Sequence, residues 1–343
     1  MQIYLNAYLE KNFGDDLFVK IIVDRYKNHT FYAISNSYKT RDNLQIYKNT
    51  LKMRILNKLG LKEKVYINSK DISVSIGGSM FIEGLSPIER KKIYGNNPYY
   101  ILGSNFGPYK TEKFYKKGYE LFKNAEDVCV RDKYTYNLFK DLPNVRYAPD
   151  IVFTLDTSKI KISEEKKAII SVIDCENKLG KQYQEKYENM IKEMIEFFIE
   201  NGYKVALMSF CKRENDEIAI ERILNNLDEN TKQQVQKYFY DGNVEEALNY
   251  IAQSQIIVGT RFHANILGLL LRKTVIPIIY SNKTTEFLKD IKFEGKTIDI
   301  KGDCKFNLTL EDLKYKKDVT KEIEKAQEQF KALDKLLNNI NII

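Results

Sequence analysis

Two basic side chains and a histidine stand beside predicted strand ends in the last third of the chain. Arg261 and His263 follow a short apolar strand that ends at Gly259, and Lys283 follows the next apolar strand. An arginine can bind a carboxylate or phosphate through two parallel hydrogen bonds, and a histidine can titrate near neutral pH. This combination predicts an anion-binding site that also contains a proton donor.

The local structure expected around Arg261 and His263 suits that chemistry. Residues 261–272 are apolar on nearly every side, which indicates a buried helix with Thr260 as its N-cap. A helix N-terminus offers unpaired N–H donors and the positive end of the helix dipole. In a purely structural interpretation, Arg261 instead pairs with a neighbouring carboxylate and His263 is a satisfied core histidine.

Such a site needs a sheet that brings several strand ends together, and both halves of the chain predict one. Short apolar strands alternate with amphipathic helices, which is typical of parallel α/β folds. The predicted strands of the first half are 31–34, 72–76, 99–102, 128–130 and a short piece near Val145. Those of the second half are 168–173, 205–210, 256–258 and 274–280. The ends of parallel strands converge on one crevice.

A pause in this alternation marks a domain boundary. Polar and charged residues dominate between Thr154 and Lys167, after which an apolar strand begins. We therefore expect an N-terminal domain over residues 1–155, a second domain over 165–305 and a charged tail over 309–343. One apolar stripe in the tail predicts an amphipathic helix, which packs on the same chain or on a second subunit. We favour the same chain.

Composition limits the class of protein. The chain has 343 residues and a net charge of +8, from 55 Lys and Arg against 47 Asp and Glu, which favours anionic substrates or an anionic membrane face. The basic residues are mixed with acidic ones, which argues against a nucleic-acid partner. No apolar run approaches the roughly 18 residues of a membrane span. The first residues predict a strand rather than a signal peptide, so we expect a cytoplasmic protein.

The cysteines and glycines of the chain indicate structural thiols and close backbone turns. The four cysteines lack metal-ligand spacing, which predicts reduced, structural residues: Cys129, Cys175, Cys211 and Cys304. Glycines follow several predicted strands, in the segments Asn12-Phe13-Gly14-Asp15, Gly77-Gly78 and Gly103-Ser104-Asn105. A glycine lets the backbone approach a ligand closely, although a tight turn after a strand also uses glycine.

Taken in order, these motifs resemble the polysaccharide pyruvyl transferase family over most of the chain. The matching residues are Asn12, Gly14 and Asp15, the strand and glycines at 73–78, Gly103, Gly107 and Pro108, Arg131, Asp132 and Thr135, Ala148 to Asp150, and 251–283 with Arg261, His263 and Lys283. The chain has Ser79 where the family often has a third glycine, and Glu83 where it often has aspartate. The resemblance implies two Rossmann-like domains in a GT-B-like fold, with the donor site in the second and the acceptor side in the first.

The resemblance also implies an activity. It is the transfer of the enolpyruvyl unit of phosphoenolpyruvate onto two hydroxyls of a sugar, which forms a pyruvate ketal in exopolysaccharide or capsule biosynthesis. His263 would donate the proton and Arg261 would bind the carboxylate or phosphate. The expected substrate-binding residues are Arg131, Lys283, Asn12, Gly14, Asp15, Gly77, Gly78, Gly103, Ser104 and Asn105. We expect no cofactor besides this donor and no metal, although a divalent ion bridging the phosphate is compatible with the chemistry.

Several alternatives stay open at this point. A GT-B-like glycosyltransferase would use the same cations for the diphosphate of a nucleotide sugar, but Glu245, Glu246 and Glu286 are weak candidates for its ribose-binding glutamate. A non-catalytic glycan-assembly protein could keep the same fold. Asp15, Asp132 and Asp150 either position sugar hydroxyls or cap turns. The acceptor sugar can be nucleotide-linked, lipid-linked at the inner membrane face, or polymeric.

Overall fold

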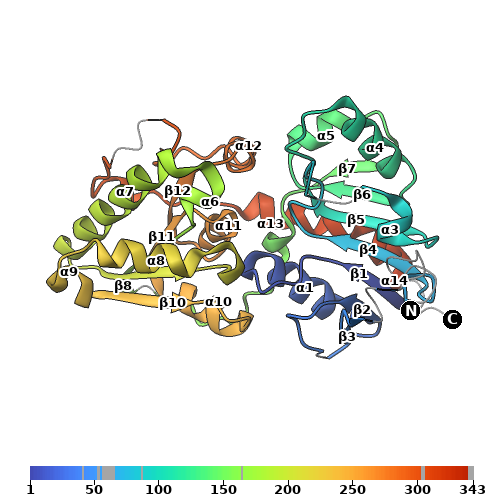
Figure 1. Cartoon of the computed structure of the whole chain (residues 1–343), viewed down its shortest axis with the longest axis horizontal. Coiled ribbons are helices and arrows are strands. Elements are labelled where there is room, and N and C mark those ends of the chain that lie inside the picture. The colour runs from blue at the N-terminus through green and yellow to red at the C-terminus, as the bar shows by residue number, and fades with distance from the viewer. Residues whose placement is uncertain are drawn as a thin grey trace. The chain divides into compact units, whose positions relative to one another are not determined.

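The apolar segments form two parallel sheets, one in each of two units of the chain (Figure 1). The computed structural model describes residues 1–40, 42–51, 55, 66–85, 88–163, 165–302 and 306–338. The first unit contains residues 1–10, 17–154 and the chain from Lys321 onward, and the second contains residues 11–16 and 155–320. The predicted α/β class with two Rossmann-like domains is confirmed. Residues 11–16, which we expected in the first domain, cluster with the second unit.

In the first unit the strand order is β3-β2-β1-β4-β5-β6-β7, and all neighbours are parallel. The strands are β1 (Gln2–Asn6), β2 (Thr30–Ile34), β3 (Leu44–Tyr47), β4 (Ile72–Ile76), β5 (Tyr99–Ser104), β6 (Asp127–Val130) and β7 (Val145–Tyr147). The helices are α1 (Phe13–Arg25), α3 (Arg90–Tyr94), α4 (Glu112–Lys123), α5 (Lys133–Phe139) and the 3-10 helix η2 (Ile151–Thr154). The glycines that follow β4 and the Gly103-Ser104-Asn105 segment at the end of β5 lie at the carboxyl edge of this sheet.

In the second unit the order is β10-β9-β8-β11-β12-β13, again with parallel neighbours. The strands are β8 (Glu165–Ser171), β9 (Lys204–Ser209), β10 (Val235–Phe239), β11 (Ser254–Gly259), β12 (Thr274–Ile279) and β13 (Ile298–Asp299). The helices are α6 (Cys175–Leu179), α7 (Lys181–Glu200), η3 (Lys212–Glu214), α8 (Asp216–Asn225), α9 (Glu229–Gln233), α10 (Val244–Ala252), α11 (Phe262–Leu270), α12 (Asn282–Asp290) and η4 (Asp312–Lys314). The order reverses between β8 and β11, and such a reversal opens a crevice at the carboxyl ends of the strands.

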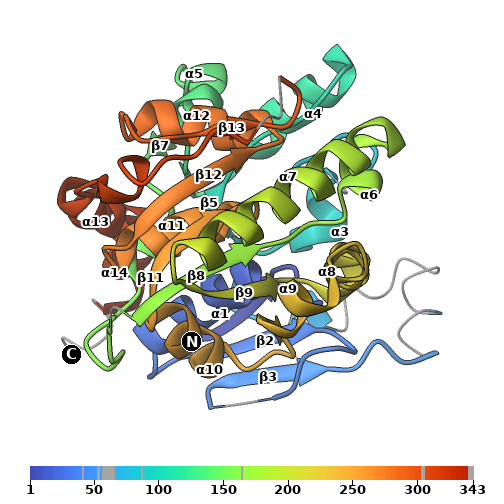
Figure 2. The same ribbon diagram turned by 90° about the vertical axis from the view of Figure 1, so that its left-hand side faces the viewer.

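The two faces of this second sheet bury different helices (Figure 2). Alternate residues of β8 and β11, such as Ile170 and Val258, share one apolar cluster with α7 and α8. Ile257, the residue before Val258 in β11, lies on the opposite face and packs against α11. A side chain on Gly268 of α11 would press against Ile257 and Val275. Because side chains alternate along a strand, β11 is covered on both faces. The start of α11 is therefore fixed against a rigid sheet.

The charged tail divides between the two units. It contains α13 (Thr320–Ala326), η5 (Gln327–Phe330) and α14 (Lys331–Asn338), and residues 309–320 cluster with the second unit instead. Phe330, Leu333 and Leu337 of the predicted stripe are buried. Asp334 pairs with Arg25 at 2.6 Å, and Gln329 accepts a hydrogen bond from the Gly103 amide at 3.0 Å. The amphipathic tail therefore packs on its own chain.

Candidate functional site

Arg261 and His263 lie at the junction of β11 and α11, beside the reversal of strand order. Arg261 is the N-cap residue and α11 begins at Phe262, so Thr260 is not the N-cap that we predicted. The hydroxyl of Thr260 instead lies 3.1 Å from the hydroxyl of Tyr187 in α7. This contact was not predictable because α7 precedes Thr260 by many residues and reaches it only across the sheet.

The guanidinium of Arg261 is engaged by two carboxylates of its own unit. Its Nε donates to Asp216 Oδ2 at 3.0 Å, Nη2 donates to Asp216 Oδ1, and Nη1 pairs with Glu214. Asp216 Oδ2 also accepts the backbone N–H groups of Phe210 and Cys211, both at 2.9 Å. The bidentate fork that we expected to bind a substrate anion is thus turned toward Asp216. Binding of a donor by the same fork would require these bonds to open.

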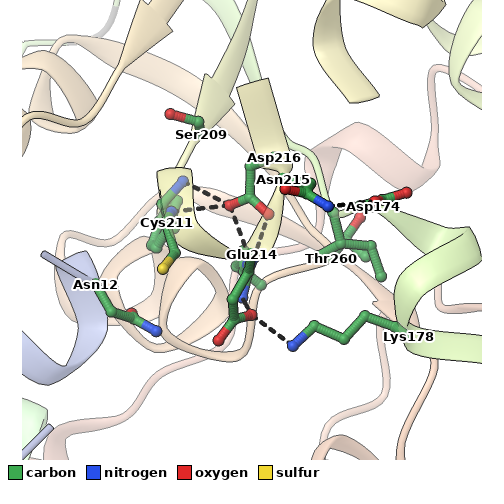
Figure 3. A network of polar contacts seen from close by, with 12 residues as sticks. Asn12, Asp174, Lys178, Ser209, Cys211, Glu214, Asn215, Asp216 and Thr260 are labelled. Carbon is green, nitrogen blue, oxygen red and sulfur yellow. Dashed lines mark hydrogen bonds and ion pairs between the residues drawn. The ribbon is translucent and has the colours of Figure 1, made fainter. Parts of the chain in front are cut away.

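The charges around Arg261 balance one another. Lys178 of α6 lies 2.5 Å from Glu214, so two cations face two carboxylates, and Figure 3 shows Lys178 pointing toward Glu214. Burial alone would raise the pKa of Glu214, but Arg261 and Lys178 outweigh burial and lower it to about 2. Burial opposes the charge of Arg261, yet Asp216 and Glu214 hold its pKa well above the ordinary value. Burial raises the pKa of Asp216, and Arg261 and two backbone N–H groups oppose that rise. Two cations and two carboxylates nearly cancel, so the cluster offers little net attraction to an anion.

The N-x-G-D segment packs against this cluster. Asn12 pairs with Cys211 in an isolated antiparallel bridge, and the Phe13 amide donates to the Phe210 carbonyl at 2.9 Å. A side chain on Gly14 would overlap Nδ1 of His263 and lie 2.7 Å from its Cγ. The motif therefore places its glycine directly against the histidine of the R-x-H motif, and a glycine is needed there for reasons of space.

Two residues beside this motif were not predicted as site residues. The hydroxyl of Tyr240 donates to Asp16 Oδ2 at 2.6 Å, and the Phe13 ring lies 4.9 Å from the Tyr240 ring. Asp15, which we did predict, is half-buried in the first turn of α1. Asp16 could have been predicted as a site residue because it directly follows Asp15 of the N-x-G-D motif. Glu214 and Asp216 could have been found because they follow the predicted strand 205–210.

Lys283 stands near the start of α11, as expected for a residue after the neighbouring strand. Its Nζ lies 5.6 Å from the centre of the Phe262 ring, and Phe262 contacts Phe287 of α12 with ring centres 5.3 Å apart. The first turns of α11 and α12 are therefore neighbours. The structure brings together the predicted residues of the second unit: Asn12, Gly14, Asp15, Arg261, His263 and Lys283.

The other predicted residues form a separate cluster in the first unit. Arg131 donates to Asp150 at 2.8 Å and to Asn105 Oδ1 at 2.7 Å, and both Arg131 and Asp150 are buried. A side chain on Gly78 would overlap the guanidinium of Arg131. Ser104 donates to the Gly77 carbonyl at 2.8 Å. Like Arg261, Arg131 binds a carboxylate of its own unit in this structure.

The remaining polar positions of the first unit have structural contacts. Asp132 is the N-cap of α5 and accepts the Thr135 amide at 2.7 Å. Asp150 accepts the Val152 amide at 2.9 Å in addition to Arg131. Gly103 has a φ of +66°, and a side chain there would lie 2.7 Å from Ile151. For Asp132 the turn-capping alternative is the one that the structure displays.

Metal-ligand clusters, membrane-spanning helices and cysteines can each be sought among the described residues. Across the described residues, no group of three or more His, Cys, Asp or Glu is arranged to hold a metal ion. Within the same ranges, no helix is long and apolar enough to cross a membrane. Cys129, Cys175 and Cys211 are buried free thiols, and burial raises the pKa of Cys129 to about 12. Cys304 lies outside the described residues.

Solved structures share this two-domain fold. A trehalose-6-phosphate synthase, OtsA, superposes with a TM-score of 0.57 over 100% of this chain and 99% of that one, at 7% identity. S. aureus MnaA, solved with UDP, gives a TM-score of 0.54 over 98% of this chain and 88% of that one, at 11% identity. At such identities the similarity concerns the fold alone, which is GT-B-like as the resemblance implied.

Sequence comparison is more specific. The Erwinia amylovora protein AmsJ, described as an amylovoran biosynthesis protein, is 21% identical over 258 residues, which are 68% of this chain and 62% of AmsJ. The match thus spans less than two thirds of that relative. The polysaccharide pyruvyl transferase profile matches residues 12–282, from the asparagine of the N-x-G-D motif to the residue before Lys283. Because this match includes most of the chain and both motif clusters, the chain belongs to the polysaccharide pyruvyl transferase family.

Proposed function

We propose that this protein transfers the enolpyruvyl unit of phosphoenolpyruvate to two hydroxyls of a sugar and forms a pyruvate ketal during cell-surface polysaccharide synthesis. The observation that carries the proposal is the contact between Gly14 and His263. It joins the first and last motifs of the family match at the carboxyl edge of one sheet. His263 is half-buried at the start of α11.

The chemistry requires one acid and one place for a leaving phosphate. Protonation of the methylene carbon makes the neighbouring carbon electrophilic, and the first sugar hydroxyl adds there and loses its proton. The carbon–oxygen bond to phosphate then breaks with its electron pair as the second hydroxyl closes the ring. The products are a cyclic ketal and inorganic phosphate. We assign the proton donation to His263, because a histidine can exist as acid and base near neutral pH.

Arg261 supports this site as a positioning residue in our proposal. It joins the start of α11 to the loop after β9 through Asp216, and the same loop receives Asn12 and Phe13. Misplacing a catalytic group by about 1 Å can cost roughly 100-fold in rate. Loss of Arg261 would therefore reduce turnover by moving His263, even without a direct bond to the donor.

The acceptor side of the proposal is broader. The family description names a polysaccharide, so we propose a sugar acceptor, with Arg131 and the glycine segments of the first unit as candidate binding residues. The net charge of +8 favours a lipid diphosphate carrier at the inner face of the membrane. The donor is proposed to be used without a further cofactor.

Transfer in heavy water tests the proposal. The protein is incubated with phosphoenolpyruvate and a panel of nucleotide-linked, lipid-linked and polymeric glycans in D₂O. The expected product is a ketal whose methyl group carries one deuterium, together with inorganic phosphate. Release of a nucleoside diphosphate from a nucleotide sugar, with phosphoenolpyruvate intact, would identify a glycosyltransferase instead.

A binding experiment needs no acceptor. A ligand present at about 100 times its dissociation constant adds ~2.7 kcal/mol of stability, which shifts the melting temperature by a few degrees. We expect phosphoenolpyruvate to stabilise the protein and UDP-glucose not to do so. Stabilisation by neither ligand, with no transfer to any glycan, would favour a non-catalytic assembly protein.

A further inference from the structure

The first turn of α12 contains two hydroxyl groups whose hydrogen-bonding capacity is unused. Ser281 is the N-cap residue, but its side chain accepts no capping hydrogen bond. Thr284, three residues later, has no exposed surface. Neither Ser281 Oγ nor Thr284 Oγ1 has a hydrogen-bond partner among the described residues, and both atoms are buried. Native proteins pair most buried hydroxyls, so such atoms call for an explanation.

Both hydroxyls belong to the first turn of one helix. Side chains lean toward the N-terminus of their helix, so Thr284 leans back toward Ser281. The Thr284 amide donates to the Ser281 carbonyl at 3.1 Å, which closes the turn through the backbone and leaves the serine hydroxyl unused. Both unpaired hydroxyls therefore lie at the N-terminal end of a nine-residue helix.

The charges of this turn suit an anion. The first turn of α12, all of it within the described residues, carries no acidic side chain. The N–H groups at its start and the positive end of the helix dipole lie at the same end of the helix as the two hydroxyls. Lys283 adds a cation between Ser281 and Thr284. In the Arg261 cluster, by contrast, two carboxylates already match the two cations.

The turn also adjoins the candidate catalytic histidine. β11 and β12 are parallel neighbours, so α11 and α12 start at the same edge of the sheet. Lys283 Nζ approaches the Phe262 ring, and Phe262 precedes His263. Burial raises the pKa of Tyr280, directly before Ser281, and the nearby charge of Arg261 offsets part of that rise. A ligand bound at the start of α12 would therefore lie beside the R-x-H motif.

We propose that the first turn of α12 binds a phosphate group, with the hydroxyls of Ser281 and Thr284, the first backbone N–H groups and Lys283 as its donors. A tetrahedral dianion accepts several hydrogen bonds at once, and this turn supplies only donors at its opening. The assignment of that group as the phosphate of phosphoenolpyruvate rests on the proposed function. Phosphate binding itself does not.

The decisive variant is Thr284→Val, because valine keeps the shape of threonine and removes only the hydroxyl. Removing an unpaired buried hydroxyl should raise the melting temperature of the free protein slightly. The same change should weaken binding of inorganic phosphate and phosphoenolpyruvate by roughly tenfold to a hundredfold, because a hydrogen bond to a charged group is lost. Affinities are measured by calorimetry with inorganic phosphate, phosphoenolpyruvate, pyruvate and UDP.

Thr285→Val is the matched control, since Thr285 follows in the same turn and its hydroxyl is not among the buried unpaired atoms. It should change phosphate affinity by less than about twofold, within the usual effect of a surface substitution. Ser281→Ala provides an independent second variant and should weaken phosphate in the same direction as Thr284→Val. Pyruvate lacks the phosphate, so its affinity should be equal in all three variants.

The outcomes separate this proposal from the proposed function. Equal phosphate affinity in wild type, Thr284→Val and Ser281→Ala overturns the phosphate site, even if ketal forms at the normal rate. So does a Thr284→Val protein that is less stable when free and binds phosphate normally. Weakened phosphate binding without any ketal product supports the site and refutes the transferase proposal. If the variant loses affinity for UDP but not for phosphoenolpyruvate, the turn binds phosphate from another ligand and its assignment to the donor is wrong.

Discussion

Gly14 lies directly against the imidazole of His263, so closely that a methyl group on its Cα would overlap Nδ1. The two residues come from opposite ends of the family match, yet both belong to the second unit. The contact fixes one edge of the imidazole by backbone rather than by a flexible side chain. It also explains why the N-x-G-D motif needs a glycine at this position.

Gly14→Ala should therefore impair catalysis more than stability. The added methyl group must push the imidazole away, and a shift of about 1 Å at a catalytic group costs roughly 100-fold in rate. The measurement is ketal formation by purified protein, alongside its melting temperature. Gly302→Ala is the matched control, because its nearest neighbour would be 3.6 Å away in ordinary contact. Equal rates for both variants would show that the position of His263 does not limit turnover.

His263→Ala should abolish most transfer while the fold persists, because the side chain is half-buried at a helix start. The rate at which deuterium appears in the ketal methyl group measures the proton transfer. The other histidine provides the comparison. His29 is buried, with Nε2 3.2 Å from the Leu337 carbonyl, so His29→Gln should lower the melting temperature and keep the deuterium label. A His263→Ala protein that forms the labelled ketal at a near-normal rate would exclude His263 as the acid.

Breaking the Arg261–Asp216 pair should destabilise the second unit. Asp216→Asn keeps the side-chain shape but leaves a buried guanidinium poorly compensated, which costs about 3–5 kcal/mol. Arg261→Lys should cost a similar amount, because an ammonium group cannot reproduce the two parallel bonds to Asp216. Urea unfolding measures the loss in the free energy of unfolding for each single variant and for the double variant.

In the double variant the two losses should fall well short of additive, since residues in one ion pair couple by about 0.5–3 kcal/mol. Lys192→Gln is the surface control. Its pair with Glu196 is half-exposed at 3.8 Å, and its removal should cost under about 1 kcal/mol. Strict additivity of the Arg261 and Asp216 changes would contradict the paired arrangement. Weakened phosphoenolpyruvate binding without any loss of stability in Arg261→Lys would restore Arg261 as a direct ligand.

Glu214 should make the protein sensitive to acid. In the folded state its pKa is lowered from 4.5 to about 2, so the unfolded chain takes up the proton at higher pH. The stability from its charge is complete above about pH 4.5 and is lost as the pH falls toward 2, on the order of 3 kcal/mol in total. Glu214→Gln should be less stable at neutral pH and show a flatter decline between these values. If the stabilities of wild type and Glu214→Gln fell in parallel between pH 4.5 and pH 2, the lowered pKa of Glu214 would be refuted.

The order of the central elements, and the place of Arg261 and His263 at a strand end, followed from the sequence because both depend on local pattern. The central strands are apolar runs between amphipathic helices. The motif with Arg261 and His263 directly follows one of these runs in the sequence, so it lies at a strand end whatever the order of strands in the sheet. The strands missing from the prediction, β3, β10 and β13, are short or at a sheet edge. The sequence of β10, Val-Gln-Lys-Tyr-Phe, places two polar residues in the middle of the strand, so it contains no apolar run that would predict it.

Tertiary structure decided which charges meet. Nothing local to Arg261 indicates that its fork closes on Asp216 rather than on a substrate, because the pair forms only when β9 and β11 deliver their loops to the same edge of one sheet. The same holds for residues 11–16. In the sequence they are flanked on both sides by residues of the first unit, yet they pack with the second unit. The unused hydroxyls of Ser281 and Thr284 are likewise invisible in the sequence, since only packing around a helix start determines whether a hydroxyl finds a partner.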